Sequence, residues 1–404
     1  MKLTADSRQL PVGWKIKYLD ELCENLDSKR VPITKSARKS GNIPYYGASG
    51  LVDYVADYIF DEDLLLVSED GANLLARTYP IAFSITGKTW VNNHAHVLRF
   101  KEKITQSFIE YYLNSISLVP YVSGMAQPKL NQKSLNSIAI PLPPLVDQQR
   151  IVAVLDEVFE GINRAIANTE KNLANSRELF ESYLNTIFTQ KGDGWEEKKL
   201  EDICKEITVG HVGSMASKYR DSGIPFLRSQ NILPFKINLD NVVFIDEEFN
   251  SALKKSQLKP GDLAIVRTGY PGTAAVIPEG IGIANCSDLV IVKPGSNINS
   301  HYLCLFFNSI FGKILVGSRL VGAAQKHFNI TTAKKVLIPF PSLTEQNRIV
   351  TKMDELAAET QRLETIYRQK IAALNELKQS ILQKAFTGEL TADTPKTAKE
   401  EIAA

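Results

Sequence analysis

Apolar residues recur at alternating steps of three and four along two long stretches of the chain. In residues 147–191 the pattern includes Val152, Leu155, Phe159, Ile162, Ile166, Leu173, Phe180 and Ile187. Residues 343–390 repeat it less regularly, and Ser342 followed by Glu345 has the form of a capping box at a helix start. A seven-residue apolar period predicts two long helices, each with one apolar stripe. Because neither helix can bury its stripe alone, we expect the two to pair as an antiparallel coiled coil.

Between these stretches, short apolar runs alternate with Gly, Pro and Asn, which are typical turn residues. Strands are predicted at residues 63–67, 96–100, 262–266 and 288–292, and helices at residues 107–116 and 301–310. Each segment of this kind therefore mixes helix and strand. The pattern predicts an α+β protein whose globular parts contain curved sheets.

The sequence contains an internal duplication. GWKIKYLDELCENL (13–26) returns as GWEEKKLEDICKEI (194–207), and IAIPLPPLVDQQRIVAVLDEV (138–158) returns as VLIPFPSLTEQNRIVTKMDEL (336–356). The two copies agree at their ends and hardly at all in their middles. This pattern indicates a tandem duplication of a globular segment and a long helix. The expected division is residues 1–146 and 192–342 as pseudo-symmetric globular domains, 147–191 and 343–390 as long helices, and 391–404 as a flexible tail.

Composition changes this picture little. Apolar residues make up 44% of the chain and charged residues 23%, which is ordinary for a globular protein. No apolar run is long enough for a membrane span, and the first ten residues lack the apolar core of a signal peptide, so we expect a soluble, cytoplasmic protein. With 47 basic and 45 acidic residues, net charge alone does not indicate a nucleic-acid partner.

Familiar catalytic and metal-binding motifs are missing from the sequence. It has no P-loop, no G-x-S-x-G and no C-x-x-C pair among its four cysteines. His94 and His96 could hold a metal with Asp70, but the second copy has Cys286 and Asp288 at the corresponding place, which favours a structural role. Gly269-Tyr-Pro-Gly272 does not match a dinucleotide fingerprint. We therefore predict no catalytic residue and no metal ligand, and a binding function instead.

The candidate binding residues lie in the divergent middles of the two copies. In the first copy they are Lys29, Arg30, Lys35, Arg38, Lys39, Tyr45, Tyr46, Lys88, Asn92, Asn93 and His94. In the second copy they are Lys218, Arg220, Arg228, Ser229, Gln230, Asn231, Arg267 and Thr268. Arg reads guanine, Asn and Gln read adenine, and hydroxyl groups bind phosphate. Each residue alone is more often a solvated or structural side chain, and clustering at equivalent places in both copies makes DNA binding an equally supported interpretation. Trp90, between two strands, is predicted to belong to the core.

The chain resembles the DNA-specificity subunit of type I restriction–modification systems over essentially its whole length. The resemblance rests on IPLPPLVDQQRIV and IPFPSLTEQNRIV, on GW-x-x-x-x-L-x-[DE] opening each half, on GIPFLRSQNI (223–232) and on AFTGEL (385–390). PYYGASG (44–50), SEDG (68–71) and WVNNHAHVL (90–98) are similar to one common subclass of that family's recognition domains. Ser342 stands where the family usually has a second proline.

The resemblance implies a function that the residues alone do not determine. Each globular domain would be a target-recognition domain for one half of an asymmetric bipartite site in double-stranded DNA. The paired helices would set the gap between the halves and dock two adenine-N6 methyltransferase (modification) subunits, which restriction/translocase subunits can join. S-adenosylmethionine, ATP and magnesium would then be bound by those partners, and this chain would perform no catalysis.

Two other functions stay open from the sequence. One is a metal-dependent nuclease that uses Glu69, Asp70 and His94. The other is a coiled-coil adaptor that binds proteins and makes no contact with nucleic acid. The duplication over the whole length favours the specificity subunit over both.

Overall fold

The computed structural model describes residues 10–124, 126–320 and 327–390, and the predicted tail 391–404 lies outside them. The chain divides into two compact units. Unit 1 comprises Met1–Thr169 and Gln369–Ala404, and unit 2 comprises Glu170–Arg368. Both long helices are therefore shared, since the division cuts each of them near its middle.

The two long helices confirm the heptad prediction. They are α4 (Leu145–Gln190) and α10 (Leu343–Thr387), and α4 continues unbroken through Gly161. In unit 1, the Nζ atom of Lys378 lies 3.4 Å from Oδ1 of Asn163. In unit 2, Arg177 forms a two-point ion pair with Glu364, with distances of 2.6 and 3.1 Å. Because a later residue of α4 pairs with an earlier residue of α10, the helices run antiparallel.

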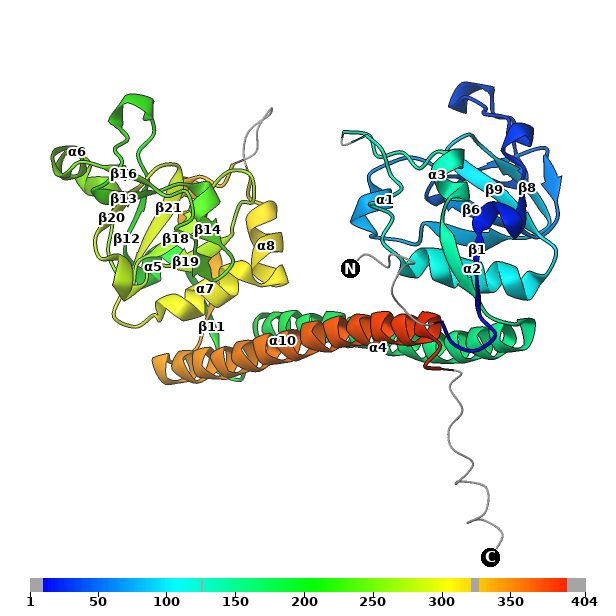
Figure 1. Ribbon diagram of the computed structural model, residues 1–404. Coiled ribbons are helices and arrows are strands. Elements are labelled where there is room, and N and C mark those ends of the chain that lie inside the picture. The colour runs from blue at the N-terminus through cyan, green and yellow to red at the C-terminus, as the bar shows by residue number, and fades with distance from the viewer. Residues whose placement is uncertain (1–9, 125, 321–326, 391–404) are drawn as a thin grey trace, which may run out of the picture. The chain divides into compact units, whose positions relative to one another are not determined.

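The described residues of unit 1 form three sheets and, besides the long helices, three short α-helices; Figure 1 shows how they are arranged. Its strands are β1 (Lys15–Tyr18), β2 (Cys23–Asn25), β3 (Ser40–Gly47), β4 (Gly50–Val55), β5 (Phe60–Asp61), β6 (Leu64–Ser68), β7 (Ala82–Ile85), β8 (Lys88–Val91), β9 (Ala95–Phe100) and β10 (Ala139–Leu142). Its helices besides α4 and α10 are α1 (Asn73–Ala76), α2 (Lys103–Ser115) and α3 (Gln132–Asn136). The sheet orders are β2-β9-β6-β7, β4-β3-β8-β5 and β1-β10.

Unit 2 has the same kinds of element. Its strands are β11 (Glu196–Lys199), β12 (Cys204–Val209), β13 (Ile224–Leu227), β14 (Ile232–Leu233), β15 (Lys236–Ile237), β16 (Val243–Ile245), β17 (Gln257–Leu258), β18 (Leu263–Val266), β19 (Ala274–Val276), β20 (Ala284–Cys286), β21 (Leu289–Pro294) and β22 (Leu337–Phe340). Its shorter helices are α5 (Leu200–Ile203), α6 (Glu247–Ala252), α7 (Ser300–Asn308), α8 (Ile310–Gly317) and α9 (Ile330–Lys334).

The middles of the two copies share a topology that their sequences do not show. Unit 2 has the orders β12-β21-β18-β19, β16-β13-β20-β17 and β11-β22, plus the added hairpin β14-β15. Each large sheet therefore corresponds strand for strand between the units. In both units the second sheet contains one parallel pair, β3 with β8 and β13 with β20. The duplication therefore covers the whole globular domain, although the sequences of the two middles have diverged beyond recognition.

The segments whose sequence agrees between the two copies make the same hydrogen bonds in both units. Gln148 and Gln346 are buried in the first turns of α4 and α10, and each donates its Nε2 hydrogen to a proline carbonyl, Pro143 at 2.9 Å and Pro341 at 3.0 Å. Asn131 and Asn329 accept a backbone hydrogen bond as N-caps of α3 and α9, both at 2.9 Å. These amides join the proline strands to the helices, so the sequence is retained there.

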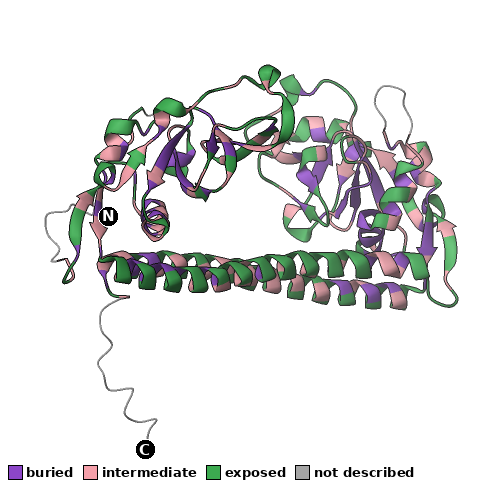
Figure 2. Ribbon diagram, turned by 90° about the vertical axis from the view of Figure 1, so that its right-hand side faces the viewer, coloured by how far each residue is buried: buried purple, intermediate pink, exposed green. Residues whose placement is uncertain are grey.

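In each unit, an aromatic contact joins the globular domain to a long helix. In unit 1, Phe386 of α10 packs against Phe108 and Tyr112 of α2, with ring centroids 5.3 and 5.1 Å apart. In unit 2, Phe188 of α4 packs against Tyr302 and Phe306 of α7 at 5.5 and 5.4 Å. In each unit, buried residues concentrate on the sheets and on the helix facing them (Figure 2). Within the described residues, no helix is both long and apolar enough to cross a membrane.

Candidate nucleic-acid interface

Three loops of unit 1 meet at one edge of its sheets. Strands β3 and β8 are parallel, so the residues after them leave at the same edge. Ser68, the last residue of β6, pairs with Ala95, the first residue of β9, which brings the β6 end to that edge as well. The loops are joined directly, because the Ser68 hydroxyl donates to the Ala48 carbonyl and the Asn92 amide donates to the Tyr46 carbonyl at 3.0 Å.

Unit 2 has the same edge. The Ser287 amide, after β20, donates to the Leu227 carbonyl at the end of β13 at 3.0 Å, and the His211 amide, after β12, donates to the Cys286 carbonyl at 2.8 Å. Arg267 and Thr268 follow β18 and reach the same place. We call these two loop clusters the loop edges of units 1 and 2: residues 48–49, 69–71 and 92–94, and residues 210–212, 228–229, 267–272 and 287–288.

Asp288 organises the loop edge of unit 2. Its carboxylate accepts from Arg267 Nη1 at 2.8 Å and from the Thr268 hydroxyl at 3.1 Å. Its backbone is in the left-handed region, with φ of 53°. The Arg267 side chain is 16% exposed and that of Asp288 is 47% exposed, so this ion pair is open to solvent on one side. Arg267 therefore reaches the surface in a fixed orientation.

The strand pairing corrects the correspondence that the sequence indicated for the two histidines. Val67 lies in the core cluster that contains α2, as Ile265 lies in the cluster that contains α7, so these two residues are equivalent. Val67 pairs with His96 and Ile265 with Val290, so Val290 stands where His96 stands and Asp288 where His94 stands. The structural role predicted for these residues is consistent with their contacts. His94 is exposed and its Nδ1 lies 2.8 Å from Asp70 Oδ2. His96 is 1% exposed and lies in the core.

Beneath the loop edge of unit 1 lies a charged cluster that the sequence did not indicate. His96 Nδ1 lies 2.6 Å from Asp27 Oδ2 and its Nε2 lies 2.7 Å from the Leu130 carbonyl, so both ring nitrogens face an oxygen acceptor. Arg30 donates to Glu69 at 2.6 Å and to the Ala95 carbonyl at 2.8 Å, and Lys129 lies 3.1 Å from Glu69. We call Asp27, Arg30, Glu69, His96 and Lys129 the charged cluster.

The carboxylates of this cluster are ionised. Burial raises the pKa of Asp27, but the hydrogen bonds from His96 and the Val97 amide and the charge of Arg30 outweigh it, so the pKa lies below its usual value. For Glu69, burial likewise opposes ionisation, and Arg30, His96 and Lys129 together lower its pKa. The ligand atoms of Asp27, Glu69 and His96 lie within 4.8 Å of one another, close enough for a metal ion. However, Arg30 and Lys129 already balance their charge, so the cluster fits a structural role.

The predicted binding residues of unit 1 fall into two groups. Lys29, Lys35, Lys39, Lys88, Asn93 and His94 are exposed. Arg30, Arg38, Tyr45, Tyr46 and Asn92 instead make contacts inside the unit. Arg38 lies over the Tyr45 ring at 4.3 Å and pairs with Asp53 at 3.0 Å, Tyr45 is 1% exposed, and burial raises the pKa of the half-buried Tyr46. The buried Asn92 accepts from the His94 amide at 2.8 Å, which shapes the loop after β8.

Unit 2 divides in the same way. Lys218, Arg220 and Gln230 are exposed, and Arg220 forms an ion pair with Asp246 at 2.9 Å. Arg228 and Ser229 are half-buried, and Arg228 donates to the Asn241 carbonyl at 2.9 Å. Asn231 is fully buried and accepts from the Arg228 amide at 3.0 Å. Its contacts position the loop after β13 and are internal to the unit.

Sequence reasoning missed the most exposed apolar side chains of this edge. Tyr270 is 84% exposed and Val212 is 71% exposed. Tyr270 lies in the turn between β18 and β19, whose glycines Gly269 and Gly272 both have left-handed φ, 85° and 89°. A tight turn bounded by such glycines holds its central side chain in solvent. The sequence Gly269-Tyr-Pro-Gly272 does predict a turn, which would have indicated an exposed tyrosine, whereas its comparison with a dinucleotide-binding motif did not.

The core position predicted for Trp90 and the chemistry of the four cysteines can also be compared with the structure. Trp90 is half-buried and donates its indole hydrogen to the Val31 carbonyl at 2.7 Å. All four cysteines are free, and burial raises the pKa of each thiol, so none of them is a thiolate nucleophile at neutral pH.

Comparison with known proteins gives one consistent result. The family model described as the type I restriction modification DNA specificity domain matches residues 11–173 and again residues 192–373. A Haemophilus influenzae protein assigned as a type I restriction enzyme specificity subunit is 30% identical over 354 residues, which cover 85% of this chain and 87% of that protein.

Solved structures show the same fold. A chain solved in work on complex assembly and conformational transition of the type I R-M system matches with a TM-score of 0.72 and 18% identity, over 95% of this chain and 100% of that one. The HsdS subunit of Thermoanaerobacter tengcongensis matches with a TM-score of 0.58 and 20% identity, over 95% of this chain and 99% of that one.

Proposed function

Since this chain belongs to the type I restriction–modification DNA-specificity family and is a specificity subunit of such a system, we propose that each of its recognition domains reads one half of an asymmetric bipartite DNA site. One observation carries the proposal. The family model matches the chain twice, and the two copies share their strand order but present different side chains at their loop edges. Equal scaffolds with unlike surfaces are suited to two different half-sites.

The chemistry of the loop edges supports base reading. Arg267 is held by Asp288 with part of its guanidinium open to solvent, and a fixed arginine can donate two parallel hydrogen bonds to guanine. Exposed lysines of unit 1, such as Lys29 and Lys39, can neutralise phosphates, although Lys39 precedes β3 and lies at the opposite end of that strand from the loop edge. Hydrogen bonds join the loops of each edge to one another, which fixes the backbone that carries these side chains.

The long helices are assigned two tasks in this proposal. A helix of 46 residues is about 69 Å long, enough to span half-sites separated by about one turn of DNA, roughly 34–36 Å. Their exposed faces would dock two adenine-N6 methyltransferase subunits, with restriction/translocase subunits joining the complex. S-adenosylmethionine, ATP and magnesium would be bound by those partners. This chain would select the site and leave the chemistry, including base flipping, to them.

The decisive test is adenine-methylation sequencing of DNA from cells that express this chain with its neighbouring methyltransferase, compared with cells that lack this chain. We expect a two-part methylated motif with a fixed gap and unlike halves, which disappears without the chain. A perfectly palindromic motif would contradict the asymmetry of the two domains. Unchanged methylation in cells with confirmed expression and complex formation would reject the proposed function.

Arg228 and Arg267 are expected to contribute to reading of the second half-site only. Replacing either by alanine should relax discrimination in that half by about 1–3 kcal/mol and leave the first half unchanged. Methylated motifs of the variants, read by sequencing, measure the effect. Lys293→Ala is the matched control, because Lys293 lies at the far end of β21 from Asp288 and pairs with Glu206. If both arginine variants methylate the same motif as wild type, these two residues do not read bases.

A further inference from the structure

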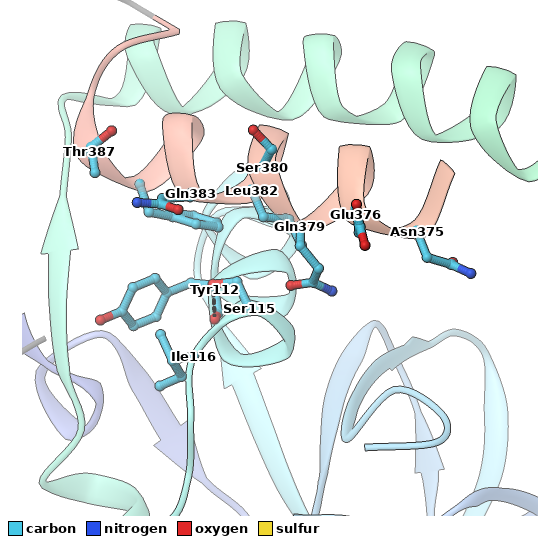
Figure 3. Close-up of a pocket in the computed structure, with 11 residues that line it drawn as sticks. Tyr112, Ser115, Ile116, Asn375, Glu376, Gln379, Ser380, Leu382, Gln383 and Thr387 are labelled. Carbon is cyan, nitrogen blue, oxygen red and sulfur yellow. Dashed lines mark hydrogen bonds between the residues drawn. The ribbon is translucent and has the colours of Figure 1, made fainter. Parts of the chain in front are cut away.

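An open groove lies in unit 1 beside the contact that ties the recognition domain to its long helix. Its volume is about 780 Å³, and it runs between the end of α2 and the last turns of α10. Tyr112, Ser115 and Ile116 form one side, and Gln379 and Gln383 lie on the α10 side (Figure 3). Neither side-chain amide of these two glutamines makes a hydrogen bond to any residue that the structure describes.

The duplication shows what this kind of groove can hold. Phe386 with Tyr112 in unit 1 corresponds to Phe188 with Phe306 in unit 2, so Gln383 of α10 corresponds to Asn185 of α4. In unit 2 the position beside them is filled by α8. Its Phe311 ring packs edge-on against Phe306 at 6.2 Å, and the Phe311 amide donates to Asn185 Oδ1 at 3.0 Å.

The contact with Asn185 satisfies a specific need of α8. The first amides of a helix have no carbonyl partner within the helix. In α8, the Ser309 hydroxyl accepts from the Gly312 amide at 3.0 Å and Asn185 accepts from Phe311. In unit 2, α7 therefore supplies an aromatic surface through Phe306, and the long helix α4 supplies a side-chain acceptor for the first turn of α8.

Unit 1 keeps this receiving surface but has no helix to place on it. Its chain is shorter here: Leu130 stands 15 positions after Ser115, whereas the equivalent Phe328 stands 19 positions after Ser309. A difference of four residues is about one helical turn. No helix follows α2 directly among the described residues, and Ser117 stands where Phe311 stands in unit 2.

We propose that this groove binds a helical segment of a partner protein that carries an aromatic residue in its first turn, in the way that unit 2 binds its own α8. The aromatic ring packs on Tyr112 and Phe386, and the Gln383 side chain accepts a hydrogen bond from a first-turn amide. The partner binds unit 1 at the place that α8 fills in unit 2. The two halves of the chain are therefore unequal in partner binding as well as in DNA reading.

Other occupants fit the groove poorly. Residues 391–404, which follow α10, contain no Phe, Tyr or Trp, and neither do residues 1–9. The residues that line the groove include Glu376 and no Lys or Arg, so the surface does not attract DNA. In a second copy of the chain, Phe311 is already packed within its own unit. The occupant that fits the groove is therefore a helix of a different protein with an aromatic residue in its first turn.

The test uses the full chain and a fluorescein-labelled peptide with the sequence of residues 309–320, SIFGKILVGSRL. Fluorescence anisotropy should show saturable binding. Gln379→Trp, which fills the groove from an exposed helix position, should abolish it, and Gln383→Ala should weaken it by about threefold to tenfold, the range for one lost neutral hydrogen bond. A peptide with alanine in place of the phenylalanine should bind at least about tenfold more weakly. Lys384→Ala, one residue further along α10 and outside the groove, should bind as wild type does.

A second measurement asks whether the assembled complex occupies the groove. This arm rests on the proposed function, because it uses the neighbouring methyltransferase subunit as the probe. The complex formed with that subunit should no longer bind the peptide. Absence of saturable binding, equal binding by Gln379→Trp, or equal binding by the free chain and the complex would overturn the inference. None of these outcomes bears on the methylated motif, so failure of this inference and failure of the proposed function can be told apart.

Discussion

Adding one helical turn to both long helices is expected to move methylation to a DNA site with a longer gap. Four residues inserted after Thr169 in α4 and before Ala372 in α10 lie at facing positions, because Asn163 faces Lys378 and Arg177 faces Glu364. The insertions lengthen each helix by about 6 Å. Since one base-pair step is about 3.4 Å, the gap should grow by one or two base pairs, while both half-site sequences stay the same.

Methylation sequencing reads this outcome directly. The original motif should disappear from cells that carry the double insertion, and the longer motif should replace it. The matched control inserts the four residues in α4 alone, which breaks the register between the helices and should abolish methylation altogether. Methylation of the original motif by the double insertion would exclude a role of the helices in setting the gap.

Asp27→Ala is expected to destabilise unit 1 by about 3–5 kcal/mol, the cost of removing one partner from a buried charge network. Asp27 accepts from His96 and from the Val97 amide, and its side chain is 9% exposed. Without it, the buried His96 ring and the Val97 amide each lose a hydrogen-bond acceptor. Urea unfolding with hydrogen exchange of β6 and β9 reports on unit 1, and exchange of β18 and β21 in unit 2 serves as the internal reference.

The same residue predicts how unit 1 responds to acid. The pKa values of Asp27 and Glu69 are lower in the folded chain than the usual values of about 3.9 and 4.3. Their contribution to stability is therefore complete above about pH 5 and is lost as the pH falls through the folded values. Wild-type unit 1 should lose stability in that range, and Asp27→Ala should lose less.

Asp53→Ala is the matched control for this prediction. Asp53 also pairs with an arginine, Arg38, but its side chain is 40% exposed, so solvent already screens the interaction. It should change the unfolding transition of unit 1 far less than Asp27→Ala. Equal effects of the two substitutions would show that the charged cluster has no special importance for unit 1.

The candidate site was predictable only where its residues act locally. Exposed lysines such as Lys29 and Lys39 follow from composition and turn signals. The contacts of Arg30 do not, because Glu69 lies 39 positions away and Ala95 lies 65 positions away. For the same reason His96 was compared with the wrong residue of unit 2, since only strand pairing aligns it with Val290.

The sequence by itself determined the duplication, the two long helices and the family. Helices arise from contacts three and four residues apart, so their apolar period is written in consecutive residues, and the joining side chains Gln148 and Gln346 are retained because each makes the same internal bond. Only the tertiary structure showed that the dissimilar middles share one strand order, that the charged cluster exists, and that α8 fills in unit 2 what stays open in unit 1. These features depend on pairs of residues far apart in the chain, and a sequence with no visible repeat in its middles carries no local signal for such pairs.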